Sequence, residues 1–266
     1  MTVSLAGTRS SDAGTVVADR VADILVLFTR EADELGVTEI ARRLDISKAV
    51  VHRILQSLVS RDLLAPARAG RAYRLGTAAA VLGVRALGAL DMRAAAAPIL
   101  RQLRIDTAET VTLSRLVGRE RVYIDQIDSP HEITMTVGLG VRHPLHAGAS
   151  GKAMLAYLDS VERDAVLSAE LPSLTADTVV DRAALADQLT EIRARGVATS
   201  FGERLADAAA VAAPVLLPTG EVYGAVSVCG PRFRFDEAAV GRWSPLVKGA
   251  ATAVSRAATR FEWTRP

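Results

Sequence analysis

The chain has 266 residues but only one cysteine, Cys229. A single cysteine excludes an internal disulfide, and it argues against a structural zinc site, which usually needs several Cys or His ligands. Aromatic residues make up only 4% of the chain. Half of the residues are nevertheless apolar, which is enough to build a sizeable core in one large or two ordinary domains.

Long apolar runs are also missing. The N-terminal stretch MTVSLAGTRSSDAGT lacks a basic start followed by an apolar run, so it is not typical of a secretory signal. No run approaches the roughly 18 apolar residues that a membrane-spanning helix needs. We therefore expect a cytoplasmic protein with no membrane partner. Residues 1–15, which are rich in Ser, Thr, Gly and Ala, are expected to form a disordered tail.

Acidic residues are scarce in one segment. Residues 42–74 contain eight Lys or Arg residues but only two acids, Asp45 and Asp62, although the net charge of the whole chain is only +2. Such an asymmetry suggests a basic binding surface on an otherwise neutral protein. A solvated face without a partner is the alternative explanation.

The same part of the chain has the pattern of a winged helix-turn-helix over residues 16–76. Helical spacing from Val16 predicts a first helix that fades near Gly36, and Thr38 is a plausible N-cap for a short second helix. After a three-residue break, Ser47 is a good N-cap for a third helix over residues 48–61. A small β-hairpin with its turn at 69–70 should follow and form the wing.

The third helix should present one face to DNA. Its apolar stripe is expected to hold it on the domain core, and its first turns are the part that enters the major groove in this motif. Wing arginines could reach phosphates or a minor groove. The candidate DNA-binding residues are Thr38, Ser47, Lys48, Ala49, His52, Arg53, Arg68 and Arg71. Three partners stay open for Arg53: a base edge, a phosphate, or an acid of its own domain. Arg61, at the far end of the helix, is interpreted as structural or solvated.

Residues 77–91 predict a helix that is apolar or small on nearly every side. Such a helix must be buried. It is either a linker helix used in self-association or a core helix, and the sequence leaves both open.

Residues 92–262 predict an α+β domain with a mainly antiparallel sheet. Helices are expected over 92–107, after the glycines at 148–151, over 181–196 and over about 237–260. Two strands should flank Gly118, a third is expected at 132–137 (EITMTV), and a strand hairpin should turn at Thr219-Gly220.

Four stretches together resemble the IclR-type family of bacterial transcription regulators: TEIARRLDISKAVVHRILQSLV, YRLG, PLHAGASGKAMLA and AAPVL…GAVSVCGP. The resemblance implies an N-terminal winged helix domain, a dimerising linker helix and a C-terminal effector-binding domain of GAF-like architecture. It also implies a homodimer or a dimer of dimers on palindromic double-stranded operator DNA, without a cofactor, and we expect repression rather than activation. Family members usually carry Ser-Thr where this chain has Ala49-Val50, which puts base readout at these two positions in doubt.

No catalytic residues are predicted. The loop Gly148–Gly151 lacks the spacing of a nucleophile elbow, and with Lys152 it also fails the pattern of a phosphate-binding P-loop. An enzyme acting through the C-terminal domain is therefore only the alternative reading. In the family this loop forms one wall of an effector pocket, which implies effector-binding roles for Ala149, Ser150, Ser200, Ala208, Ala210, Ser227 and Cys229.

The alanine run ADAAAVAAPV suggests a roomy, apolar pocket for a small organic acid, either aromatic or longer-chained. A well-packed strand is the alternative. The backbone N–H groups of the loop are expected to bind the carboxylate.

Overall fold

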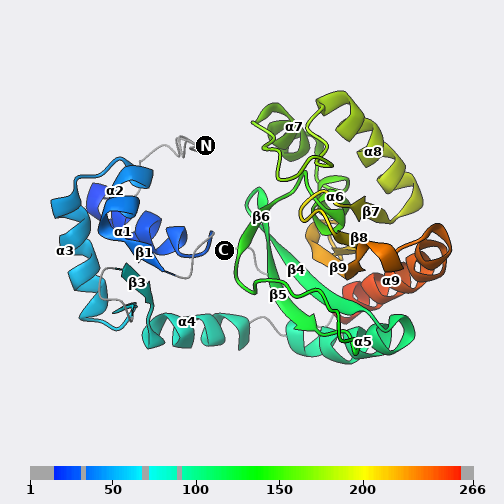
Figure 1. Cartoon of the computed structure of the whole chain (residues 1–266), viewed down its shortest axis with the longest axis horizontal. Coiled ribbons are helices and arrows are strands. Elements are labelled where there is room, and N and C mark those ends of the chain that lie inside the picture. Colours follow the sequence, from blue (N-terminus) through cyan, green and yellow to red (C-terminus); the bar gives the residue numbers. More distant parts are fainter. Residues whose placement is uncertain (1–14, 31–33, 68–71, 89–91, 259–266) are drawn as a thin grey trace. The chain divides into compact units, whose positions relative to one another are not determined.

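The computed structural model describes residues 15–30, 34–67, 72–88 and 92–258 (Figure 1). The chain divides into two compact units, Met1–Leu90 and Asp91–Pro266, and each is described by itself. No helix in the described ranges is long and apolar enough to cross a bilayer. Most of the tail predicted at residues 1–15 lies outside the described ranges; Thr15 accepts a hydrogen bond from the Ala18 N–H and caps the first helix.

The first unit is a winged helix-turn-helix. Its elements are α1 (Val16–Leu27), β1 (Leu35–Gly36), α2 (Val37–Leu44), α3 (Lys48–Val59), β2 (Leu64–Pro66), β3 (Ala72–Leu75) and α4 (Thr77–Gly88). The three strands form an antiparallel sheet in the order β1-β3-β2. The helices α1, α2 and α3 enclose one apolar cluster, in which Ile24, Ile40 and Leu55 are fully buried.

Two predictions for this unit are wrong, and one strand was not predicted. Helix α1 ends at Leu27, well before Gly36. Thr38 does not cap α2; it lies inside the helix, whose N-cap is Gly36 and has no side-chain hydrogen bond. A third strand, β1, pairs with β3 through two residues, which is too short a segment for any periodicity to show. The prediction for Ser47 is confirmed, because its hydroxyl accepts a hydrogen bond from the Val50 N–H at the start of α3.

Helix α4 does not pack as a core helix. The side chains of Val81 and Leu82 are 55% and 61% exposed. The core-helix alternative for residues 77–91 is therefore wrong for this part of the helix, because both large apolar side chains face solvent. Residues 89–91 lie outside the described ranges.

The second unit is an α+β domain, as predicted, and its six-stranded antiparallel sheet has helices on both faces (Figure 1). Its elements are α5 (Met92–Thr107), β4 (Thr110–Val117), β5 (Glu120–Ile127), β6 (Arg142–Pro144), α6 (Ala149–Leu155), α7 (Ser160–Ser168), α8 (Arg182–Arg195), β7 (Ala198–Phe201), β8 (Ala208–Leu216), β9 (Val222–Pro231), the short 3-10 helix η1 (Arg232–Arg234) and α9 (Glu237–Ala258). The strand order is β6-β5-β4-β9-β8-β7.

The two faces of this sheet belong to different cores. Alternate residues of β4, β8 and β9, such as Leu113, Val211 and Val226, pack with Leu100 of α5 and Val247 of α9. We call this side the apolar face. The opposite residues face α6 and α8, with Ala212 and Ala225 in the second cluster. We call this side the effector face, after the residues predicted there.

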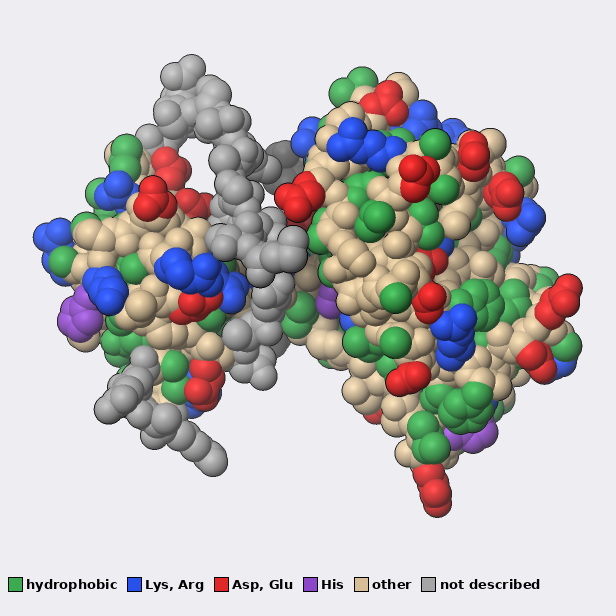
Figure 2. Space-filling view, turned by 45° about the horizontal axis from the view of Figure 1, so that its top comes forward, with side chains coloured by type: hydrophobic (Ala, Val, Ile, Leu, Met, Phe, Trp, Pro, Cys, Tyr) green, Lys and Arg blue, Asp and Glu red, His purple; other side chains and the backbone are tan. Residues whose placement is uncertain are grey.

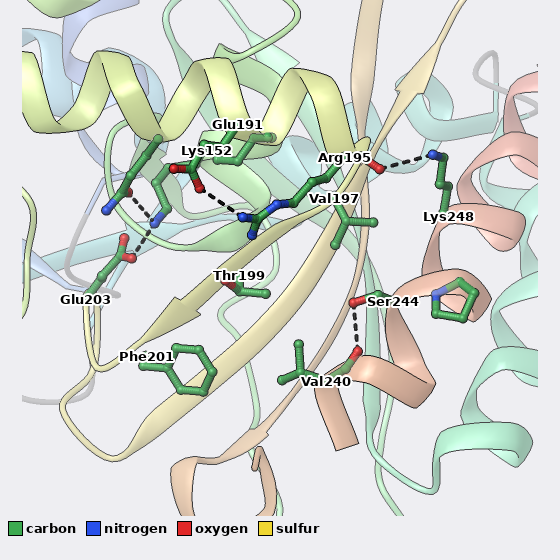
Figure 3. A pocket seen from close by; sticks show the side chains of 13 residues that line it. Lys152, Glu191, Arg195, Val197, Thr199, Phe201, Glu203, Val240, Ser244 and Lys248 are labelled. Atoms are coloured by element: carbon green, nitrogen blue, oxygen red, sulfur yellow. Dashed lines mark hydrogen bonds and ion pairs between the residues drawn. The ribbon is translucent and has the colours of Figure 1, made fainter. Parts of the chain in front are cut away.

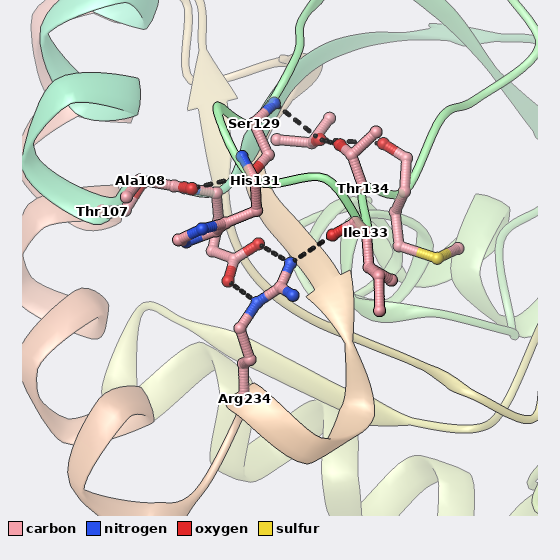
Figure 4. A network of polar contacts seen from close by, with 10 residues as sticks. Thr107, Ala108, Ser129, His131, Ile133, Thr134 and Arg234 are labelled. Atoms are coloured by element: carbon pink, nitrogen blue, oxygen red, sulfur yellow. Dashed lines mark hydrogen bonds and ion pairs between the residues drawn. The ribbon is translucent and has the colours of Figure 1, made fainter.

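The strand predicted at residues 132–137 is wrong. The segment is irregular, and β6 forms later, at Arg142–Pro144. Side chains bind this backbone in place of a neighbouring strand: the Thr110 hydroxyl donates to the Met135 carbonyl (2.8 Å) and Gln126 accepts from the Val137 N–H (2.6 Å). Arg234, which pairs with the buried Glu109, donates to the Ile133 carbonyl at 2.9 Å (Figure 4). The alternating apolar residues at 132–137 thus match the pattern of a strand, but no neighbouring strand in the described ranges pairs with them.

Candidate functional site

Helix α3 separates its apolar and cationic sides cleanly. The stripe that packs on the core consists of Val51, Ile54, Leu55 and Leu58. The predicted DNA-contacting residues on the same helix, Lys48, Ala49, His52 and Arg53, are all exposed. Arg53 has no ion pair with any described acid, so the alternative of an internal partner does not hold among these residues. Its guanidinium is free to reach an external anion.

The basic character of this unit is smaller than its sequence suggests. Glu39 lies just before the basic segment, and its carboxylate binds both Arg42 (2.8 Å) and Arg43 (2.5 Å). These two guanidiniums hold the pKa of Glu39 at about 2. Arg61 donates to the Ser57 carbonyl at 3.0 Å, in agreement with its predicted structural role.

The cations that remain lie together on the surface. Figure 2 shows Lys, Arg and His side chains gathered on one side of the first unit, at the left of the view. Arg68 and Arg71, predicted in the wing, lie outside the described residues. The exposed cationic face of α3 is therefore the part of the predicted DNA interface that the structure describes.

Five of the seven predicted effector residues share the effector face of the sheet. Directly paired residues of antiparallel strands point to the same side. Ser200 pairs with Ala210, and Ala210 pairs with Cys229, so these three form one row across β7, β8 and β9. Ser227 and Ala208 lie two residues along their strands from Cys229 and Ala210, and therefore on the same side.

The other two predicted residues, Ala149 and Ser150, begin α6, which packs on this face. Ala149 is buried in the cluster with Ala212 and Ala225, so it contributes to packing. The preceding turn depends on glycine: Gly148 has φ +85°, and a Cβ on Gly151 would lie 2.6 Å from the Leu145 carbonyl oxygen. The two glycines let the loop turn sharply and let α6 approach the backbone closely.

The loop is already bound by a carboxylate of the protein. Glu203, in the β7–β8 loop, accepts a hydrogen bond from the Gly148 N–H at 3.0 Å and forms a buried ion pair with Lys152 of α6. Lys152 also donates to the Gln188 side chain at 3.0 Å. The expected donor at Gly148 is therefore occupied, and the lysine that imitated a P-loop has an internal partner.

Polar side chains line the effector face between these positions. The hydroxyl groups of Thr112 and Ser227 are 2.7 Å apart and both residues are buried. Ser114, two residues after Thr112 on β4, donates a hydrogen bond to the carbonyl of its paired residue Ala225. Burial raises the pKa of the Cys229 thiol to about 12, so this cysteine stays protonated and is a poor nucleophile.

Four residues beside this row were not predicted from the sequence: Arg121, Tyr123, His143 and Arg204. Arg121 and Tyr123 alternate along β5 and face the same side as Ser114, because Tyr123 pairs with it. The visible signal was an arginine at an inward position of an alternating strand. It was not recognised because an arginine in a strand is usually solvated.

A separate hollow of about 530 Å³ lies at the β7 edge of the sheet, between α8 and α9 (Figure 3). Three cations line it, and each has an acceptor. Lys152 binds Glu203, Arg195 binds Glu191 at 3.3 Å, and Lys248 donates to the Arg195 carbonyl at 3.0 Å. This hollow therefore offers no unsatisfied cation to an anionic ligand.

Two family models together match almost the whole described chain. The model of the bacterial transcriptional regulator IclR C-terminal domain matches residues 84–256, and that of the IclR helix-turn-helix domain matches residues 17–68. The HTH-type transcriptional regulator BhcR of Paracoccus denitrificans is 34% identical over 94% of this chain and 90% of its own length. The glycerol operon regulatory protein of Streptomyces griseus is 32% identical over 90% of this chain and 94% of its own.

Solved structures agree with the fold. A putative IclR transcriptional regulator from a Silicibacter species is 27% identical and superposes with a TM-score of 0.82, covering 91% of this chain and 96% of the other. An IclR homologue from Microbacterium hydrocarbonoxydans, solved in complex with 4-hydroxybenzoate, is 25% identical with a TM-score of 0.74, covering 92% and 100%. The matched relatives are transcriptional regulators and not enzymes, so the enzyme reading of the second unit is set aside.

Proposed function

The chain belongs to the IclR family of transcriptional regulators, and on this premise we propose that it binds a palindromic operator as a dimer or a dimer of dimers and releases it when a small organic acid binds. The observation that carries the DNA-binding part is the exposed cationic face of α3, with Lys48, His52 and Arg53 opposite the buried stripe. A positive helix face of this kind fits the major groove.

The acid-sensing part rests on the effector face of the sheet. There Ser227, Cys229 and Ala210 lie side by side under α6, with buried hydroxyl groups next to methyl groups. Such a surface suits a ligand with a polar end and an apolar body. The structural relative bound to 4-hydroxybenzoate supports an aromatic acid as one member of the class.

Association through α4 is the third part of the proposal. Val81 and Leu82 expose large apolar side chains on a helix that also carries Ala79 and Ala80. Exposed apolar surface on one helix is a common mark of an interface. A second copy of the same helix would cover it and would place two α3 helices on the two halves of a palindrome.

The DNA-binding part is tested by selecting duplexes from a random library with the full-length protein. We expect enrichment of a palindromic sequence. Arg53→Ala should then weaken binding by about 1–3 kcal/mol if the side chain reads a base edge. Arg61→Ala removes the same charge from the turn that follows α3 and should change the affinity little. Fluorescence anisotropy at fixed salt measures both, and equal losses in the two variants would contradict a specific role for Arg53.

The dimer is tested with Leu82→Glu. The two introduced carboxylates would repel each other across the dimer, and the apolar contact of Leu82 would be lost. We therefore expect a lower mass by light scattering together with weaker operator binding. Val161→Glu, at an exposed apolar residue of α7, is the control. A monomeric parent protein would contradict this part of the proposal. Repression is a separate prediction. Expression of a reporter gene placed behind the selected operator should decrease when the regulator is produced.

A further inference from the structure

Arg121 is an unusual residue for the interior of this unit. It lies on β5, and only 1% of it is exposed. Two of its nitrogen atoms, Nε and Nη1, are buried without any hydrogen-bond partner. No described carboxylate forms an ion pair with it. A buried guanidinium without acceptors is costly, because it has lost its hydrogen bonds to water and no acceptor replaces them.

A second arginine lies close to the first. Arg204, from the β7–β8 loop, and Arg121 both lie over the ring of Tyr123, with their guanidinium carbons 5.9 Å and 4.5 Å from the ring centroid. Arg204 likewise has no ion pair among the described residues. We call Arg121, Arg204 and Tyr123 the arginine cluster. Two like charges in one partly buried place repel each other unless an anion lies between them.

His143 does not supply an acceptor that compensates the two arginines. Its ring contacts Tyr123 edge-on at 5.4 Å, and its Nε2 is also buried without a partner. Burial lowers its pKa to about 3, and the charges of Arg121 and Arg204 contribute in the same direction. The imidazole is therefore neutral at physiological pH and can offer a hydrogen bond to a ligand without adding charge.

The two buried glutamates among the described residues of this unit do not neutralise the cluster. Glu203 is held by Lys152 and by the Gly148 N–H, and both carboxylate oxygens of Glu109 accept hydrogen bonds from Arg234. Each acid has its own cation, so the two arginines of the cluster remain in excess. The polar residues of the face therefore add up to a net positive site.

The cluster lies beside the predicted effector residues. A Cβ on Gly148 would be 3.6 Å from the Arg121 Nη2, which places the guanidinium against the glycine loop. The charges of Arg204 and Arg121 both act on the Cys229 thiol, which joins the cluster to the row of Ser200, Ala210 and Cys229.

We propose that the arginine cluster binds the carboxylate of the effector, with Arg121 making the two-pronged contact and Arg204 supplying the second cation. This inference rests on the proposed function and assigns the anion to side chains of β5 and the β7–β8 loop. A planar guanidinium matches both oxygens of a carboxylate and is the group of choice for it in a buried place. The apolar body of the acid would then extend over Ala210. Neutral amides and esters of the same acids would leave both cations uncompensated.

The test uses the full-length protein and a panel of carboxylates, each paired with its primary amide: benzoate, 4-hydroxybenzoate, phenylacetate, succinate and adipate. Melting temperature gives a first ranking, and calorimetry gives the affinity. We expect at least one carboxylate to bind while its amide does not. Arg121→Met should lower the affinity for that acid about thirty-fold or more, since one partner of a buried charge pair is lost. Arg121→Lys keeps the charge but not the fork, so it should recover part of the loss.

A readout without ligand separates binding from a structural role. If Arg121 awaits an anion, Arg121→Met removes an uncompensated charge and should leave the melting temperature of the ligand-free protein unchanged or higher. A structural arginine would give a lower one. Arg115→Met is the matched control, because Arg115 lies on the neighbouring strand β4 but contacts Tyr223 on the apolar face. It should bind the acid as the parent does.

The outcomes distinguish this inference from the proposed function. The proposed role of the arginine cluster is wrong if carboxylate binding survives Arg121→Met, or if no carboxylate of the panel binds. Either result holds even if an operator is selected. Arg121-dependent carboxylate binding without any selected operator leaves the anion site in place and contradicts the regulator. A ligand-free Arg121→Met protein that melts well below the parent also overturns the inference.

Discussion

The two faces of the six-stranded sheet are built by the same strands but in opposite ways. The apolar face presents residues such as Leu113, Val226 and Val228 to α5 and α9. The effector face carries buried hydroxyl groups, the Lys152–Glu203 ion pair and Arg121. Close-packed apolar contact is the main source of stability, whereas buried polar groups are retained at a cost. The apolar face therefore holds the domain together, and the polar character of the other face agrees with our proposal that a ligand binds there.

The largest effect should follow from breaking the buried ion pair. Lys152→Met leaves Glu203 buried without its cation, and we expect the free energy of unfolding to fall by about 3–5 kcal/mol. Chemical denaturation followed by tryptophan fluorescence measures it, because Trp243 is buried in the second unit against Phe235. The double variant Lys152→Met/Glu203→Gln should recover most of the loss. A double variant as unstable as the single one would show that Lys152 acts through packing alone.

A matched pair of substitutions compares the faces directly. Leu113→Ala empties a fully buried site on the apolar face and should cost about 2–5 kcal/mol. Ser227→Ala, on the effector face, removes one hydroxyl and leaves Thr112 unpaired, so we expect a loss of about 1–3 kcal/mol. Thr112→Val/Ser227→Ala replaces both partners and should be nearly neutral. If Ser227→Ala costs as much as Leu113→Ala, the two faces contribute equally to stability and the distinction fails.

The smallest effect at neutral pH should come from His143. Its pKa is about 3 in the folded protein against 6.5 for the free side chain, so the unfolded chain takes up this proton first. The contribution of the neutral His143 to the free energy of unfolding is complete above about pH 6.5 and is lost as the pH falls toward 3. The free energy of unfolding changes by at most about 1.4 kcal/mol per pH unit in this range. His143→Phe should remove this slope. His146, whose pKa burial also lowers, remains in both proteins. Identical pH profiles for parent and variant would exclude the effect.

Much of the fold could be predicted because its signals are local. The cap at Ser47 and the apolar stripe of α3 follow from side chains three and four residues apart. The hairpin of β8 and β9 follows from alternation on both sides of Thr219-Gly220. Helix α8 ends at Gly196, which adopts the left-handed conformation that glycine permits. Predictions failed where a local pattern had no partner, as at residues 132–137.

The sequence by itself determined the elements, the cationic side of α3 and the positions of the residues that gather on the effector face, because periods of two and 3.6 residues fix which side chains share a face. Only the tertiary structure decided which charges are compensated. Glu203 meets Lys152 and Gly148 from more than fifty residues away, and Glu109 meets Arg234 across the domain. Arg121 finds no such partner. Ion pairing depends on distances between segments far apart in the chain, and no local pattern records them.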